Sequence, residues 1–203
     1  FKGLRLTFSL YLVTIILSIP LGLLFALGAS SKKLILKKII EFYTWIFRGT
    51  PLLLQLFFVY YGLPVFGIKL SPFGAASFTF AINYAAYLTE IFRGGIESID
   101  KGQYEASYVL GLSYFKTMKN IILPQAIKNS LPSLGNEAIT LIKDTALVSA
   151  IGMGEILRNS KELVTTKFSI IPFILCAFIY LGLSSIVVTL FKHIEKNYAK
   201  GMR

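Results

Sequence analysis

LTFSLYLVTIILSIPLGLLFALGASS, residues 6–31, contains no Asp, Glu, Lys or Arg. A helix rises about 1.5 Å per residue, so roughly 20 apolar residues cross a hydrocarbon core about 30 Å thick. Three further charge-free stretches follow, at 49–68, 70–89 and 168–191. Four such stretches in a chain of 203 residues predict an α-helical membrane protein.

We expect one all-α, polytopic transmembrane domain over 1–203 with five membrane-spanning helices, at about 4–27, 46–66, 73–92, 132–156 and 168–191. The fourth span is interrupted by Glu137, Lys143 and Asp144, and we include it because these charges recur at helical spacing. Residues 30–40 read as a basic connector and 157–167 as a polar loop. Residues 94–131 carry charges and helix breakers, so we expect two or three short helices in water there.

The net charge of +11 is typical of nucleic-acid binding as well as of membrane proteins. Here the basic residues fall between the apolar spans, which predicts cytoplasmic loops and no nucleic-acid partner. With the N-terminus outside, 14 Lys and Arg lie inside and 6 outside, and Lys143 lies in the membrane. We therefore expect an inner-membrane protein with a cytoplasmic C-terminus and a cytoplasmic 94–131 loop.

The first charge-free stretch exceeds the 7–15-residue core of a signal peptide, so we expect it to be retained. The chain begins at Phe1, which predicts a few further residues upstream. Cys176 is the sole cysteine and excludes an intrachain disulfide. No metal-spaced cluster or nucleophile–base pair stands out, and no G-x4-G-K-[ST] phosphate loop occurs. The sequence favours neither an enzyme nor a bound cofactor.

The central loop reads EAS-x3-G-x9-I-x-LP from Glu105 to Pro124. Tyr104, Tyr108 and Leu112 recur at every fourth residue, which predicts an amphipathic helix ended by Gly111. A second stripe, Phe115, Met118 and Ile122, follows after the capping residue Ser113. Helices this short are marginal alone in water, so they pack either on their own spans or against a partner.

This loop resembles the EAA loop, E-A-A-x3-G-x9-I-x-L-P, of permeases of bacterial ATP-binding cassette (ABC) importers of type I. Ser107 replaces the second alanine. The strings 48–51 (RGTP), 83–87 (NYAAY) and 143–145 (KDT) resemble the branch that takes up polar amino acids. Together the similar strings cover about 45–165, whereas the flanking spans match in pattern only.

The resemblance implies a permease without its own ATPase site, working by alternating access. It implies cytoplasmic ATPase subunits that bind ATP and Mg, a second permease copy or close homologue, and an external solute-binding protein. It also implies that a coupling loop contacts the ATPase, with these residues: Tyr104, Glu105, Ala106, Ser107, Tyr108, Gly111, Phe115, Leu123 and Pro124.

Polar side chains within the spans mark a candidate substrate pathway, because polar groups in hydrocarbon usually face a cavity. Thr79, Asn83, Tyr87 and Glu90 form one stripe of the third span, and Lys143 and Asp144 lie in the fourth. An amino acid needs partners of both signs, which Lys143 and Asp144 offer; the alternative is that both form structural pairs. The predicted pathway comprises Gln55, Asn83, Tyr87, Glu90, Lys143 and Asp144.

The substrate remains open at this stage. An excess of acidic groups near the pathway slightly favours basic amino acids, with glutamine, glutamate and cystine as alternatives. A rival function is an ion-coupled secondary transporter, in which Glu90 and Asp144 would bind the coupling ion. Inverted repeats typify that class, and none is evident in this sequence.

Overall fold

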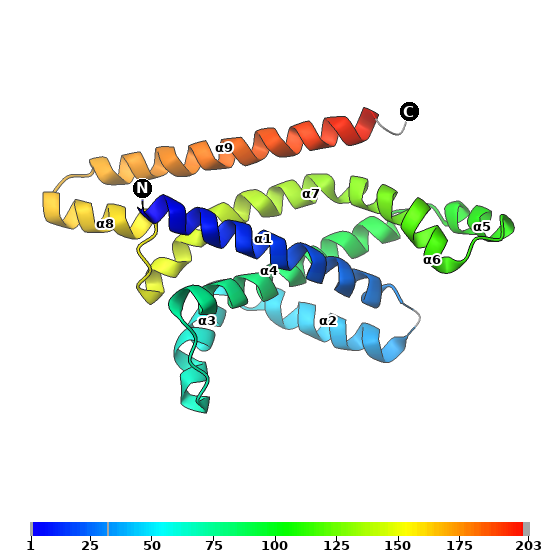
Figure 1. The fold of residues 1–203 in the computed structure, drawn as a ribbon, viewed down its shortest axis with the longest axis horizontal. Coiled ribbons are helices and arrows are strands. Elements are labelled where there is room, and N and C mark those ends of the chain that lie inside the picture. Colours follow the sequence, from blue (N-terminus) through cyan, green and yellow to red (C-terminus); the bar gives the residue numbers. More distant parts are fainter. Residues whose placement is uncertain (1, 32, 201–203) are drawn as a thin grey trace.

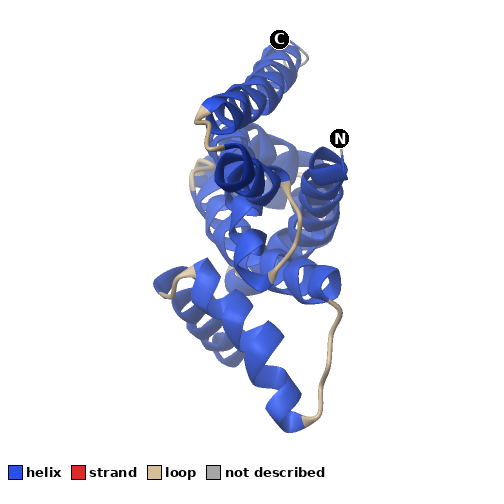
Figure 2. Cartoon of the chain, turned by 90° about the vertical axis from the view of Figure 1, so that its left-hand side faces the viewer, coloured by secondary structure: helices blue, strands red, loops and turns tan. Residues whose placement is uncertain are grey.

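The computed structural model describes residues 2–31 and 33–200, and within these residues it contains helices, turns and loops but no strand (Figure 2). The α-helices are α1 Lys2–Ala29, α2 Leu34–Gly49, α3 Leu52–Phe57, α4 Pro72–Glu97, α5 Lys101–Val109, α6 Tyr114–Thr117, α7 Leu123–Asp144, α8 Ile156–Lys167 and α9 Ile171–Lys200. Short π and 3-10 segments join them: η1 Phe58–Gly62, η2 Leu63–Phe66, η3 Met118–Ile122 and η4 Thr145–Ile151.

The long helices run back and forth along one axis (Figure 1). α1, α4 and α9 run in one direction, and α2 and α7 return in the other. The short helices α5 and α6 lie at one end of the molecule, and α8 lies at the opposite end, near the N-terminus. The α3 segment turns away from this axis.

A seam of small residues joins α1 to α4. From α1 it buries Thr14, Ser18, Gly22 and Ala26, and from α4 a run of alanines that includes Ala85. A Cβ atom added to Gly22 would lie 2.6 Å from the Leu88 Cβ, so the two backbones approach too closely for a side chain there. Small residues of this kind permit close helix packing in membranes, where van der Waals contact drives association.

The second expected span, 46–66, is not one straight helix. Its residues divide between α2 and the 52–66 segment, which meet at an angle of 101°. The break falls at Thr50 and Pro51, because proline has no N–H for the helix ladder and disfavours helical backbone at the preceding residue. α2 also begins at Leu34, within the stretch expected to be a connector.

The fourth span differs from expectation as well. α7 begins at Leu123, inside the expected loop, accommodates Pro132 within the helix and ends at Asp144. The chain continues to Ile151 as the 3-10 segment η4. Residues 157–167, expected as a loop, belong to α8, where the carboxylate of Glu155 caps the helix by accepting from the backbone N–H groups of Leu157 and Arg158.

Length and hydropathy identify α1 and α9 as helices able to cross a membrane. The bent pair of α2 and 52–66 adds a third crossing if it counts as one span. Within the described residues α4 and α7 do not meet that criterion, since both carry many polar and small residues. The five-span count therefore remains a prediction.

Candidate functional site

A cavity of about 380 Å³ opens where the α2–α3 break meets α4 and α7. Eight of its eleven lining residues carry polar side chains, although the surrounding helices are largely apolar. The lining residues are Arg48, Gly49, Thr50, Pro51, Leu52, Asn83, Tyr84, Tyr87, Glu137, Thr140 and Asp144.

Two side-chain amides hold the break that forms one wall of the cavity. The Gln55 Nε2 donates to the carbonyl oxygen of Phe47 at 3.0 Å and to the hydroxyl of Thr50 at 2.8 Å. The Asn83 Nδ2 donates to the same Phe47 oxygen at 2.9 Å and to the Gln55 Oε1 at 3.0 Å. These bonds satisfy backbone carbonyls that the end of α2 leaves without helical partners. Of the two amides, only Asn83 lines the cavity.

Basic and aromatic groups form the second wall. The Arg48 guanidinium lies over the ring of Tyr87, with its Cζ 5.6 Å from the ring centroid. One Arg48 nitrogen lies 3.7 Å from a carboxylate oxygen of Glu90, which Arg93 contacts more closely, at 2.6 Å. Glu90 therefore sits at the edge of the cavity as part of an ion-pair network between α2 and α4.

The third wall is acidic. Glu137, Thr140 and Asp144 are spaced by three and four residues, which places them on one face of α7. The Tyr84 hydroxyl donates to the Asp144 Oδ2 at 2.7 Å. Among the described residues, neither Glu137 nor Asp144 has a cationic partner within 4.0 Å. The cavity lining thus contains one guanidinium and two carboxylates, and neither carboxylate forms an ion pair within 4.0 Å in the described chain.

Lys143 does not reach this cavity. It lies on another face of α7 and lines a separate hollow against α9. Of the six predicted pathway residues, the structure brings Asn83, Tyr87 and Asp144 to the cavity, with Glu90 at its edge and Gln55 behind its wall.

The predicted pathway omitted five of the cavity's polar residues: Arg48, Thr50, Tyr84, Glu137 and Thr140. The regular spacing of Glu137, Thr140 and Asp144 was a usable signal for one wall. The position of Arg48 depends on the bend at Pro51, which hydropathy does not reveal.

Between α4 and α7 the chain forms two short helices, α5 and α6, where two or three were expected in 94–131. Asp100 caps α5, and Gly111 follows it with a φ of 68°, the left-handed conformation expected of it. Ser113 caps α6, as its position predicted. Ser107 is only 2% exposed, and its hydroxyl donates to the carbonyl oxygen of Gln103 at 2.6 Å. Burial, with a contribution from Tyr114, raises the pKa of the Tyr104 phenol.

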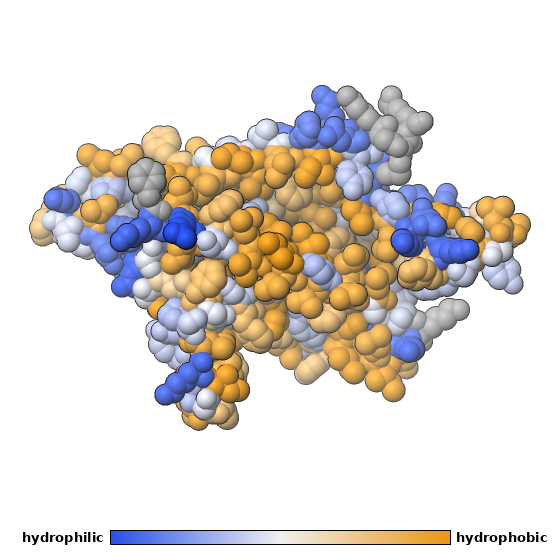
Figure 3. Space-filling view, viewed as in Figure 1, coloured by the Kyte–Doolittle hydropathy of each residue, from blue (hydrophilic) through white to orange (hydrophobic). Residues whose placement is uncertain are grey.

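The far end of this segment is an exposed apolar tip, visible at the right-hand end of Figure 3. We use "the tip" for five exposed side chains: Tyr108, Val109, Leu110, Tyr114 and Phe115. Met118 and Ile122 are buried as expected, whereas Phe115 is 72% exposed and does not join their stripe. The turn at Gly111 lies between the two halves of the tip, and the apolar side chains on both sides of it stay exposed within the described chain.

An all-helical bundle with a charged cavity beside a broken helix defines a membrane transport protein. The chain belongs to the family of binding-protein-dependent transport system inner membrane components, whose family model matches residues 18–200.

The similar proteins agree with this assignment. The arginine transport system permease protein ArtQ of Bacillus subtilis is 41% identical over 198 residues, covering 97% of this chain and 90% of ArtQ. The L-cystine transport system permease protein TcyB of the same organism is 40% identical over 180 residues, covering 88% and 77%. A crystal structure of an amino acid ABC transporter with histidines superposes with a TM-score of 0.89 at 36% identity, covering 97% of this chain and 92% of that one.

Proposed function

We propose that this chain is the membrane permease subunit of an ATP-driven importer of polar amino acids, with a preference for cationic ones. The observation that carries the proposal is the cavity in which Arg48 faces Glu137 and Asp144. An amino acid that leaves water needs an anionic partner for its ammonium and a cationic partner for its carboxylate. The cavity offers both.

The excess of negative charge supports the preference for a cationic side chain. Glu90 pairs more closely with Arg93, at 2.6 Å, than with Arg48, at 3.7 Å, so a substrate carboxylate would compete with Glu90 for Arg48. One of Glu137 and Asp144 suffices for the α-ammonium, and the other remains for a side-chain cation. The names of the relatives include arginine and cystine systems, and the arginine system agrees with this reading.

Energy would come from outside the chain. No Gly is followed by Lys in the sequence, so the phosphate loop of an ATPase has no candidate here. We assign ATP and Mg to cytoplasmic ATPase subunits that dock on the tip of α5 and α6. Tyr108 and Phe115 are 83% and 72% exposed there, as anchors for a partner subunit would be.

The arrangement of the helices supports five crossings with the N-terminus outside. Alternation of α1, α2, α4, α7 and α9 brings three basic segments to one end: the start of α2, the α5–α6 loop and the C-terminal part of α9 (Figure 1). The positive-inside rule makes that end cytoplasmic. A second permease copy, or a close homologue, and an external solute-binding protein would complete a bacterial inner-membrane complex.

Charge removal in the cavity tests the assignment. The complex with its ATPase subunits is reconstituted in liposomes, and arginine and glutamine uptake are compared for Glu137→Gln and Asp144→Asn. Loss of a charged hydrogen bond of about 1.5–3 kcal/mol weakens apparent arginine affinity roughly 10- to 150-fold. Glutamine uptake falls less, because the neutral side chain of glutamine needs no carboxylate partner of its own.

Glu41→Gln is the matched control, because Glu41 is an exposed carboxylate paired with Lys37 on α2, outside the cavity. Its uptake kinetics stay at the wild-type level. Unchanged affinity and selectivity in both cavity variants would refute the cavity as the substrate pathway.

A further inference from the structure

Lys143 is one of the predicted pathway residues that do not line the cavity at the α2–α3 break. It is exposed on α7 and lines an apolar hollow of about 420 Å³, together with Ala146, Leu157, Phe173, Cys176, Ala177 and Tyr180. No carboxylate of the described chain lies within 4.0 Å of its ammonium group. A charged group beside apolar helices in a membrane is costly and needs a partner of opposite charge.

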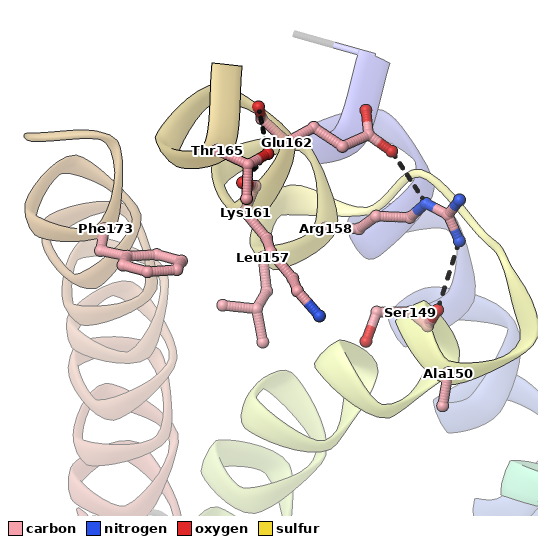
Figure 4. A pocket seen from close by; sticks show the side chains of 8 residues that line it. All are labelled: Ser149, Ala150, Leu157, Arg158, Lys161, Glu162, Thr165 and Phe173. Carbon is pink, nitrogen blue, oxygen red and sulfur yellow. Dashed lines mark hydrogen bonds and ion pairs between the residues drawn. The ribbon is translucent and has the colours of Figure 1, made fainter. Parts of the chain in front are cut away.

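A second hollow, of about 590 Å³, adjoins the first and shares Leu157 and Phe173 with it. It lies between η4, α8 and the start of α9, and Figure 4 shows Lys161 reaching into the space between Leu157 and Ser149. We call the two hollows together the α8–α9 groove.

The charges of the α8–α9 groove do not balance. The Arg158 Nε lies 3.1 Å from the Glu162 Oε1, and another Arg158 nitrogen donates to the carbonyl oxygen of Ser149 at 3.4 Å. Lys161, like Lys143, has no ion-pair partner within the part of the chain that the structure describes. The groove therefore holds three cations and a single carboxylate, which Arg158 already engages.

We propose that the α8–α9 groove binds an anionic phospholipid. Its phosphodiester lies against Lys161 in the larger hollow, Lys143 supplies a second ammonium from the adjoining hollow, and an acyl chain follows the exposed apolar surface of Phe173 and Ala177. Basic pockets between membrane helices bind anionic headgroups through this combination of charge and apolar contact.

Charge complementarity favours a lipid over a second copy of this chain. If two copies met through this groove about a two-fold axis, its three cations would face the same three cations of the second copy. The groove also lies on a different face of α7 from the amino-acid cavity. The lipid proposal therefore stands or falls independently of the proposed function.

The test uses the complete transporter complex in nanodiscs that contain a trace of photoactivatable phosphatidylglycerol or, separately, photoactivatable phosphatidylcholine of the same chain length. Labelled peptides are located by mass spectrometry. We expect peptides from 143–180 to carry several-fold more phosphatidylglycerol than phosphatidylcholine. Lys143→Gln with Lys161→Gln removes most of that preference, and Ala177→Trp reduces labelling by filling the apolar hollow.

Two matched controls accompany these variants. Lys167→Gln removes an exposed lysine of α8 that does not line the groove, and Gly182→Trp adds bulk to α9 where a Cβ meets nothing within 4 Å. Both retain wild-type labelling. Equal labelling by the two lipids would overturn the proposal, as would full displacement of the lipid by soluble glycerol 3-phosphate. Cross-links from groove residues to a second copy of the chain, in place of lipid, would assign the groove to that copy and likewise overturn it.

Discussion

The α1–α4 seam and the α5–α6 tip differ in how their residues are covered: those of the seam are buried between two helices, and those of the tip are exposed. In the seam, Gly22 and Ala85 let two helices approach until no further side chain fits. At the tip, Tyr108 and Phe115 are exposed although they are large and apolar. The difference indicates which parts of the chain are complete alone and which require a partner.

The seam is most sensitive to added volume, and Gly22→Val gives the largest expected effect. A Cβ at this position already meets Leu88, so valine forces the helices apart at a cost of about 2–3 kcal/mol. Thermal unfolding of the detergent-solubilised protein measures the loss. Gly182→Val, where a Cβ meets nothing within 4 Å, stays within about 0.5 kcal/mol of wild type. Similar midpoints for the two variants would contradict close packing in the seam.

The α2–α3 break is also stabilised by contacts within the chain, and Asn83→Leu tests how far the bend depends on them. Loss of this amide removes the donor to the Gln55 Oε1, at a cost of about 1–3 kcal/mol, whereas the Phe47 carbonyl keeps its bond from the Gln55 Nε2. The same thermal assay is used, with Asn136→Leu on the exposed face of α7 as the control. An Asn83 variant as stable as this control would show that the bend does not depend on the amide pair.

Substitutions at the tip should impair coupling to ATP hydrolysis more than they lower the free energy of unfolding. Gly111→Val places a β-branched residue at a φ of 68°, a strain of about 1–2 kcal/mol that is confined to the α5–α6 turn. We expect near-normal unfolding of the bundle, but ATP hydrolysis that no longer responds to substrate. Gly111→Asn is the control, because asparagine tolerates the left-handed conformation. Normal coupling in the valine variant would count against the tip as the docking surface.

Ser107→Ala gives the smallest expected effect. The Ser107 hydroxyl bonds only to the Gln103 carbonyl one turn earlier in α5, so its removal leaves no unpaired group outside the helix. The free energy of unfolding should stay within about 0.5 kcal/mol of wild type, and the uptake rate should stay at the wild-type level. A large uptake defect at unchanged stability would give this serine a role beyond helix packing.

Much of this organisation follows from the sequence. Charge-free length predicted α1 and α9 as long apolar helices, because spans facing lipid must be apolar and long, although α9 continues to Lys200, nine residues past its expected end. The turn at Gly111 also followed, since glycine is the residue best suited to a left-handed backbone.

The differences between the structure and the sequence-based expectations have physical causes too. The stretch 46–66 was expected as one straight span because hydropathy shows how apolar a segment is but not whether its helix axis bends, although Pro51 marked the bend. Residues 157–167 were expected as a loop because they are polar, whereas Glu155 caps a helix there and Arg158 pairs with Glu162 one turn later. Lys143 and Asp144 are adjacent in sequence, so a helix directs them to different faces.

The dependence of uptake on ATP tests the central claim most directly. Proteoliposomes contain the chain and its ATPase subunits, with the α5–α6 loop facing the lumen. ATP is enclosed in the lumen, and labelled arginine is added outside together with the solute-binding protein. The account predicts uptake that requires ATP on that side and persists when an ionophore dissipates the proton gradient. Uptake that survives ATP depletion and collapses with the proton gradient would contradict it and identify an ion-coupled carrier.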